Sequence, residues 1–362
     1  MPLSQAASTL RRRNGTATLK ERLKAVPFPG LPPPPRSERS PMKPLYLALS
    51  LTCLSHPVLA ETLTLATWNL EWQRSAPLSQ REFEECSQIK AADRERLEET
   101  HPYRWECKSP AQIADMKAVA AQLNADVIAV QEVESPEALQ QIWPQDQYDF
   151  YVNMQSPWIQ RAGFVVRKSS RLEVGRLGDV RPLGEAFKSH ARHGAELPVT
   201  IKGMTLKLLS VHLKSGCFDQ ALNSGYATKR DKANGVVTCD VLRRQAPALE
   251  AWLDKAIQSG ASAVIIGDFN RRFDAEVEHE TAPEVSLFAE LSDGEPSAAR
   301  LFRPTKGFEA LPECRGGGSR WLIDHALMSS ELRKHYVAGS LLEFPVPMKG
   351  SDHCPVAFKM KF

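Results

Sequence analysis

Short apolar segments that end in polar residues recur along this chain, and they limit what it can fold into. Each has the length of a strand, and two helical patterns, over residues 110–123 and 241–259, lie between them. The predicted strands are residues 62–68, 126–130, 163–167, 206–211, 263–266, 323–328 and 355–362. The alternation predicts a layered α/β domain over residues 61–362, with no internal repeat and no dividing linker.

Polar side chains of the kinds used in catalysis follow five of these strands. They are Asn69, Glu132, His212, Asp268 with Asn270, and Asp352 with His353. Because a packed sheet holds the ends of its strands in place, side chains at those ends can converge on one cleft. We therefore predict that these residues form a common site.

The N-terminal residues have a different character from the rest. Residues 1–41 contain an arginine run and a proline run, and we predict that they are disordered or a spurious extension. Residues 42–60 resemble a secretory signal peptide, with Lys43, an apolar stretch over 45–54 and a cleavage site near Ala60. An uncleaved anchor is the alternative. We expect an exported protein, periplasmic or secreted.

Composition and charge exclude several classes of protein. With 42% hydrophobic and 25% charged residues, the chain is not collagen-like, coiled-coil or wholly disordered. Lys and Arg number 46 against 43 Asp and Glu, but nine of the basic and two of the acidic residues precede residue 61. The remainder is slightly acidic, so net charge gives no support for broad nucleic-acid affinity, although a local basic groove stays open.

Six cysteines remain after residue 60, and an even number in an exported chain favours disulfides. Closeness in sequence favours the pairs Cys86–Cys107 and Cys217–Cys239, each stabilising by roughly 3 kcal/mol through loop entropy. Zinc is disfavoured because no pair has C-x-x-C spacing. Cys354 is expected to be buried and reduced, or paired with Cys314.

Six motifs, in order, resemble the endonuclease/exonuclease/phosphatase superfamily, which includes deoxyribonucleases, abasic-site endonucleases, sphingomyelinases and inositol polyphosphate 5-phosphatases. They are TWNLEW (67–72), VIAVQEVES (127–135), SVHLKS (210–215), IIGDFNR (265–271), WLIDHAL (321–327) and GSDHCPV (350–356). The resemblance implies a four-layer α/β sandwich, with two mixed β-sheets packed face to face and helices outside. It also implies phosphoester hydrolysis with a divalent metal.

The resemblance assigns the metal to Glu132 as the principal ligand, with Asn69 beside it and Asp352 as a second candidate. Oxygen ligands suit Mg²⁺, with Mn²⁺ or Ca²⁺ as alternatives. A purely structural role for Glu132, as the cap of a following helix, is the competing interpretation.

The catalytic residues implied by the resemblance are Asp268, Asn270, His212, and His353 with its partner Asp324. Asp268 would activate the attacking water, Asn270 would donate to phosphoryl oxygens, and His212 would stabilise the transition state or protonate the leaving oxygen. Either His353 or Asp268 could be the base, and the sequence leaves this open. An Asx turn is the competing interpretation of Asp268 and Asn270.

Three further assignments come from position alone. Arg161 is a weaker candidate for phosphate binding. His325 is expected to be structural, because it alternates with Asp324 along a strand. The histidines outside the motifs, among them His190 and His193, are expected to be solvated.

Two segments are longer than the resemblance suggests. Asn69 and Glu132 are 63 positions apart, and we interpret residues 73–110 as a surface insertion stapled by Cys86 and Cys107. A second loop, residues 216–239, carries Lys229, Arg230 and Lys232. These loops either select the substrate or only stabilise an exported enzyme.

The preferred interpretation is an exported metal-dependent phosphodiester hydrolase, an endonuclease acting on DNA or RNA by in-line attack of an activated water. The alternative is a phospholipase C-like sphingomyelinase or an inositol-phosphate phosphatase, for which Trp105, Trp143 or Trp158 would line the cleft. A non-catalytic module is disfavoured because all the motif residues are present. We expect a monomer without an obligate protein partner.

Overall fold

The computed structural model describes residues 61–94, 96–98, 101, 103–104, 106–187, 190–278, 285–296, 300–308, 322–342 and 350–362. The predicted extension and signal peptide, together with Trp105 and Cys314, lie outside these residues. The strands are β1 (Thr62–Gln73), β2 (Val127–Val133), β3 (Tyr148–Val152), β4 (Arg161–Arg167), β5 (Glu173–Val174), β6 (Gly178–Val180), β7 (Gly194–Ile201), β8 (Met204–His212), β9 (Ser262–Asp268), β10 (Leu301–Phe302), β11 (Asp324–Ser329) and β12 (Val356–Lys361). The helices are α1 (Gln80–Gln88), α2 (Ala91–Arg94), α3 (Pro110–Leu123), α4 (Pro136–Gln140), α5 (Pro182–Glu185), α6 (Lys229–Ala233), α7 (Thr238–Gln258), α8 (Phe273–Glu278), α9 (Leu287–Leu291) and a 3₁₀ helix (Ser330–Lys334).

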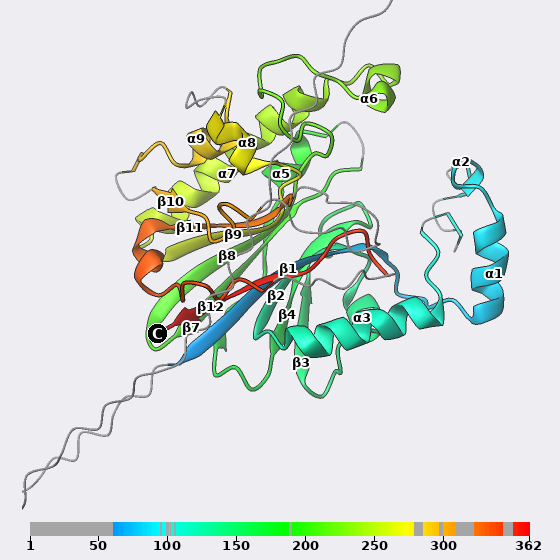
Figure 1. Ribbon diagram of the computed structural model, residues 1–362, viewed down its shortest axis with the longest axis horizontal. Coiled ribbons are helices and arrows are strands. Elements are labelled where there is room, and N and C mark those ends of the chain that lie inside the picture. The colour runs from blue at the N-terminus through cyan, green and yellow to red at the C-terminus, as the bar shows by residue number, and fades with distance from the viewer. Residues whose placement is uncertain are drawn as a thin grey trace, which may run out of the picture. The chain divides into compact units, whose positions relative to one another are not determined.

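The strands form two mixed sheets, as predicted. One has five strands in the order β12-β1-β2-β4-β3, and the other has seven on the path β10-β11-β9-β8-β7-β5 with β6 paired to β7. Strand β1 runs parallel to β2 and β8 parallel to β9, whereas β12 and β11 are antiparallel to β1 and β9. The predicted four-layer α/β sandwich is confirmed (Figure 1).

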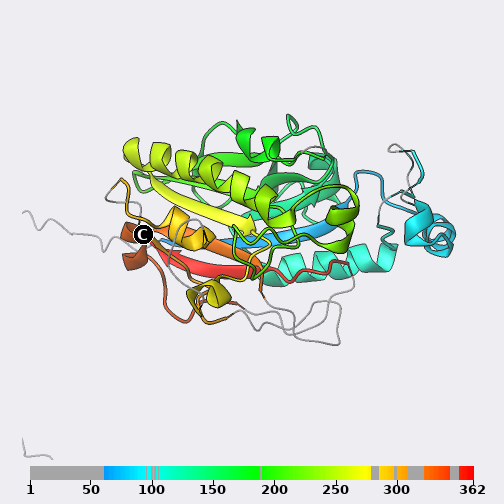
Figure 2. The same cartoon turned by 90° about the horizontal axis from the view of Figure 1, so that it is seen from above.

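Alternation along the strands divides the core into layers. In β8, Leu206 and Leu208 lie in the apolar layer that joins the two sheets, while Leu209 and Val211 pack in the layer that contains α7. A third apolar layer packs α3 and α4 against the five-stranded sheet. Helices therefore cover the outer faces of both sheets (Figures 1 and 2).

The two predicted helices are present. Helix α3 begins where Ser109 and Gln112 form a capping box and ends at Asn124, which has a left-handed conformation. Helix α7 begins at Thr238, three residues earlier than the predicted 241.

Several strands differ from expectation. Strand β1 continues through a bulge to Gln73 instead of ending before Asn69. Strands β3, β5, β6, β7 and β10 were not predicted; β7 contains Pro198, a residue that weakens the sequence signal for an interior strand.

Disulfides join Cys86 to Cys107 and Cys217 to Cys239, the pairs favoured by their closeness in sequence. Cys354 is half-buried and also disulfide-bonded, so of the two expectations the reduced thiol is wrong; Cys314, the partner named in the other, lies outside the described residues. In the part of the chain that the structure describes, none of the helices is both long and apolar enough to cross a membrane.

Candidate active site

Both sheets contribute to one group of polar side chains. Asn69 and Glu132 come from β1 and β2, and His212, Asp268 and Asp324 come from β8, β9 and β11. Neighbouring strands align these positions, because Asp268 pairs with Asp324 on one side and with His212 on the other. His353 joins the group from the segment before β12.

Asn69 connects the two sheets through its side-chain amide. Its Nδ2 donates to Glu132 Oε1 at 3.2 Å and to Asp268 Oδ2 at 3.0 Å. Its Oδ1 accepts from the backbone N–H of Glu71 at 3.0 Å, which fixes the orientation of the amide. Asn69 is 1% exposed, so these bonds form away from bulk water.

Unusual backbone conformations shape the strand ends. Glu132 and Asn270 have φ values of 60° and 50°, in the left-handed region that non-glycine residues rarely adopt. A Cβ on Gly267 would lie 2.2 Å from the carbonyl oxygen of Val211, so only glycine allows β8 and β9 to approach there. Such features concentrate at functional sites.

His353 and Asp324 form a close pair, with 2.6 Å between Nδ1 and Oδ2. Burial by itself would lower the pKa of His353, but Asp324, together with Asp268 and Asp352, raises it to about 10. The imidazole is therefore charged at neutral pH. Its backbone N–H donates to Ser351 Oγ, which in turn donates to the carbonyl oxygen of Asn69.

Asp268 lies at the centre of the group and is 1% exposed. Its Oδ2 is 3.6 Å from His212 Nε2 and 3.9 Å from His353 Nε2. Burial raises the pKa of this carboxyl; His353 lowers it, and Asp324 raises it. Asn270 donates its backbone N–H to Asp268 Oδ1 at 2.8 Å, as in an Asx turn, and its side chain donates to Leu213 O.

His212 is held by an arginine that no sequence motif marks. Nη1 of Arg192 donates to His212 Nε2 at 2.7 Å, and Nη2 donates to Leu213 O at 3.0 Å. Burial, then the charges of Arg192 and His353, lower the pKa of His212 well below its usual value. A guanidinium only donates, so Nε2 accepts and the ring is neutral. In the sequence, Arg192 lies two residues before the start of β7, and no motif marks it.

The remaining predicted residues lie in different surroundings. Asp352 is half-buried, and its Oδ1 is 3.8 Å from His353 Nε2. Arg161 starts β4, and its guanidinium donates to the backbone carbonyls of Ser156 and Glu134. His325 is buried between Thr305 and the carbonyl of Arg271, as expected for a structural histidine.

The expectation that histidines outside the motifs are solvated is wrong for His193, which is buried and bonds Asp179 Oδ1 at 2.9 Å. Trp143 and Trp158 are 2% and 9% exposed. Trp143 packs edge-on against Trp68, with 5.8 Å between ring centroids, and belongs to the core.

The group has the donor set of a cation site. Ligand atoms of Asp268, Asp324 and His353 fall within 4.8 Å of one another. Carboxylate oxygens of Glu132 and Asp352 lie 3.6 Å from His212 Nε2 and 3.8 Å from His353 Nε2, respectively. Within the described residues, the buried Oδ1 of Asp324 has no hydrogen-bond partner. Buried carboxylates need positive charge, and oxygen donors select hard divalent ions, so the residues fit such a metal.

Comparison with known proteins was made by family and by structure. The sequence model of the Endonuclease/Exonuclease/phosphatase family matches residues 66–353. No curated protein sequence matches. Truncated TDP2 of Caenorhabditis elegans has 15% identity and a TM-score of 0.47, over 83% of this chain and 97% of that chain. The human Nocturnin catalytic domain, with bound sulfate, has 14% identity and a TM-score of 0.49, over 83% and 93%. An endonuclease/exonuclease/phosphatase from Bacteroides vulgatus has 14% identity and a TM-score of 0.48, over 83% of this chain and 98% of that chain.

Proposed function

The chain belongs to the endonuclease/exonuclease/phosphatase family, whose members are metal-dependent phosphoesterases, and we propose that it is an exported endonuclease that cleaves DNA or RNA. The observation that carries this proposal is the central position of Asp268. Its carboxylate lies within 4 Å of side-chain nitrogens of Asn69, His212 and His353. This arrangement surrounds one buried base with groups that can hold a phosphodiester.

We assign the metal to Glu132, with Asn69 beside it and Asp352 as a further ligand. The alternative group of Asp268, Asp324 and His353 is less suitable, because the 2.6 Å bond between His353 and Asp324 already engages two of its three members. A bound Mg²⁺, or Mn²⁺ or Ca²⁺ in its place, would neutralise phosphate charge.

The pKa directions divide the proton chemistry between two residues that the sequence could not distinguish. The raised pKa of Asp268 makes it a stronger base than an ordinary carboxylate, so it takes the proton of the attacking water. His353 already holds its proton at neutral pH and donates to the phosphoryl oxygens as their charge grows. Asp324 positions His353 and stabilises its charged form.

The loop at residues 216–239, which follows His212 in sequence, supports nucleic acid over lipid as the substrate. The loop at 216–239 presents the exposed cations Lys229, Arg230 and Lys232 and the exposed ring of Tyr226. Basic side chains bind a phosphate backbone, and an aromatic ring offers a surface on which bases stack. Trp143 and Trp158, the described tryptophans named for lipid contact, are largely buried. The two disulfides are compatible with an extracellular location.

The test is nicking of supercoiled plasmid by the purified protein with Mg²⁺. We expect nicking that EDTA abolishes and that Glu132→Ala reduces by at least 10³-fold. Glu98→Ala, at an exposed glutamate, is the matched control and should leave the rate unchanged. Intact plasmid, with bis-p-nitrophenyl phosphate still hydrolysed, would reject the endonuclease and redirect the assay to sphingomyelin and inositol phosphates.

A further inference from the structure

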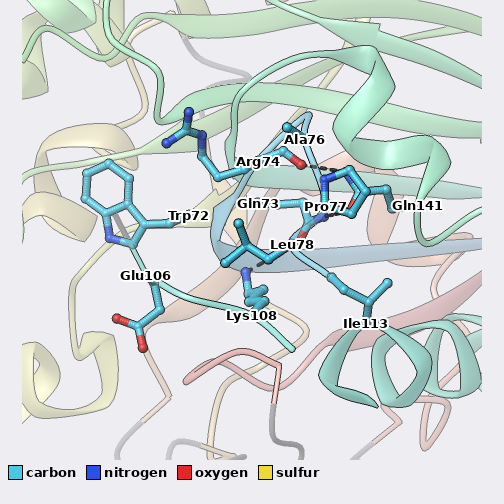
Figure 3. A pocket seen from close by; sticks show the side chains of 10 residues that line it. All are labelled: Trp72, Gln73, Arg74, Ala76, Pro77, Leu78, Glu106, Lys108, Ile113 and Gln141. Carbon is cyan, nitrogen blue, oxygen red and sulfur yellow. Dashed lines mark hydrogen bonds between the residues drawn. The ribbon is translucent and has the colours of Figure 1, made fainter. Parts of the chain in front are cut away.

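Lys108 is a buried lysine that the mechanism above does not use. It follows Cys107 directly, at the end of the insertion, and is 8% exposed. Its Nζ donates to the carbonyl oxygens of Leu70, at 2.5 Å, and of Glu71, and lies 3.4 Å from Gln73 Oε1. Figure 3 shows Lys108 and Gln73 among the residues that line a pocket beside Trp72.

The carbonyl groups that Lys108 binds belong to a strained bulge in β1. The pairing of β1 with β2 shifts between Asn69 and Gln73, and both Glu71 and Trp72 are left-handed, with φ values of 44° and 55°. Such a conformation is unfavourable for a non-glycine residue and persists only where the surrounding structure stabilises it. The hydrogen bonds from Lys108 Nζ to its three acceptors stabilise the bulge on its carbonyl side.

The N–H groups of the same bulge face the proposed metal ligands. The N–H of Glu71 donates to Asn69 Oδ1 at 3.0 Å, and that of Trp72 donates to Glu132 Oε2 at 3.2 Å. The bulge therefore orients the amide of Asn69 and one oxygen of Glu132. A chain of direct hydrogen bonds runs from Lys108 through the bulge to both side chains.

The insertion ties this lysine to a second element. Cys107 is bonded to Cys86, which lies in α1, and α3 begins at Pro110. The backbone of Lys108 is thus anchored by the disulfide on its N-terminal side and by α3 on its C-terminal side. Figure 1 places α1 and α2 beyond the end of α3, at the edge of the domain.

We propose that Lys108 is a positioning residue: it stabilises the β1 bulge, which orients Asn69 and Glu132 to bind a divalent cation. The insertion serves to place Lys108 against the bulge. The inference rests on the proposed function, since it concerns the same metal site. It gives the segment from residue 73 to 110 a role in catalysis as well as in stability.

The charge of Lys108 makes the test directional. Burial lowers the pKa of this amine to about 7, whereas Glu132, Glu106 and Asp352 favour its charged form. If Lys108 acted only as a nearby positive charge, its removal would tighten cation binding. If it positions the ligands, removal weakens binding, and partners of this kind typically contribute 10–100-fold to metal affinity or activity.

The experiment compares wild type with Lys108→Met and with Lys90→Met, an exposed lysine of the same insertion. Mn²⁺ binding is measured by electron paramagnetic resonance without substrate, and hydrolysis of bis-p-nitrophenyl phosphate is measured against Mg²⁺ concentration. We expect Lys108→Met to bind Mn²⁺ about 10-fold more weakly and to need more Mg²⁺ for half-maximal rate. Lys90→Met should match wild type.

Unchanged or tighter Mn²⁺ binding by a folded Lys108→Met, with a normal Mg²⁺ requirement, would overturn the proposal. If that variant does not fold, the double variant Cys86→Ser with Cys107→Ser replaces it, since it keeps the lysine but releases its neighbour; we expect a smaller shift in the same direction, and none would overturn the proposal. Failure of wild type itself to bind Mn²⁺ or to hydrolyse phosphodiesters would instead reject the proposed function.

Discussion

His353 and His212 lie in the same group of side chains, both close to Asp268, but the ring of His353 is charged and that of His212 is neutral. Asp324 binds Nδ1 of His353 and keeps that ring protonated, with its pKa raised to about 10. Arg192 donates to Nε2 of His212, and burial and positive neighbours keep that ring neutral. Burial lowers the pKa of both rings; Asp324 outweighs it at His353, whereas Arg192 adds to it at His212.

Because their charges differ, the two histidines have different roles at the site. A charged imidazole can donate to phosphoryl oxygens and stabilise developing negative charge. A neutral imidazole that accepts from Arg192 holds a guanidinium beside Glu132 and Asp268, where a phosphate would compete for it. Substituting each histidine and its partner in turn tests whether the two rings differ in this way.

The largest effect is expected from His353→Ala. Losing the charged donor should lower kcat on bis-p-nitrophenyl phosphate by about 10³-fold, within the range for general acid–base residues. Circular dichroism should show an unchanged fold. His101→Ala, at a histidine outside the central group, serves as the control. A His353→Ala rate within tenfold of wild type would contradict the assignment.

Asp324→Asn should follow, with a loss of about 10²-fold at pH 8 and a changed pH profile. In wild type the ring stays charged until the pH approaches about 10, because Asp324 outweighs burial. Without the carboxylate, burial lowers the pKa, so activity should fall at a lower pH as the pH rises. Rates measured from pH 5 to 10 check this, and an unmoved alkaline limb would show that Asp324 does not set the charge.

His212→Ala should cost about 10-fold to 10²-fold in kcat, because a neutral ring contributes less to charge stabilisation than an imidazolium. Its alkaline limb should stay where the wild-type limb is, unlike that of Asp324→Asn. The same pH series measures this. If the alkaline limb of the pH–rate profile shifted in His212→Ala, the titrations of the two rings would be coupled.

Arg192→Gln should have the smallest effect, a rise of about 10-fold in KM with kcat nearly kept. A phosphate would compete for this guanidinium, and loss of the guanidinium also removes one of the charges that lower the pKa of His212. Nuclear magnetic resonance of the ring should show that pKa rising. An unchanged KM would place Arg192 outside the substrate site and leave it with His212 alone.

Much of this site could be predicted from the chain alone, since strand-then-polar motifs identify residues that a sheet brings together. The pairing of strands that places Asp268 between His212 and Asp324 was not part of that prediction and comes from the folded structure. Arg192 and Lys108 could not be predicted in the same way. Neither has a motif, and each acquires its role from segments distant in sequence: Arg192 beside β8, and Lys108 on a bulge 35 to 38 positions earlier.

The sequence by itself predicted a layered α/β domain and favoured the two local disulfides, because periodicity and short spacings are local properties. Its resemblance to the family implied the four-layer sandwich and the roles of the central residues. Tertiary structure alone decided which histidine carries charge, that Arg161 binds backbone carbonyls, and that Lys108 supports the β1 bulge. Those outcomes depend on distances between segments and on burial, and only the packing of the folded chain sets either one.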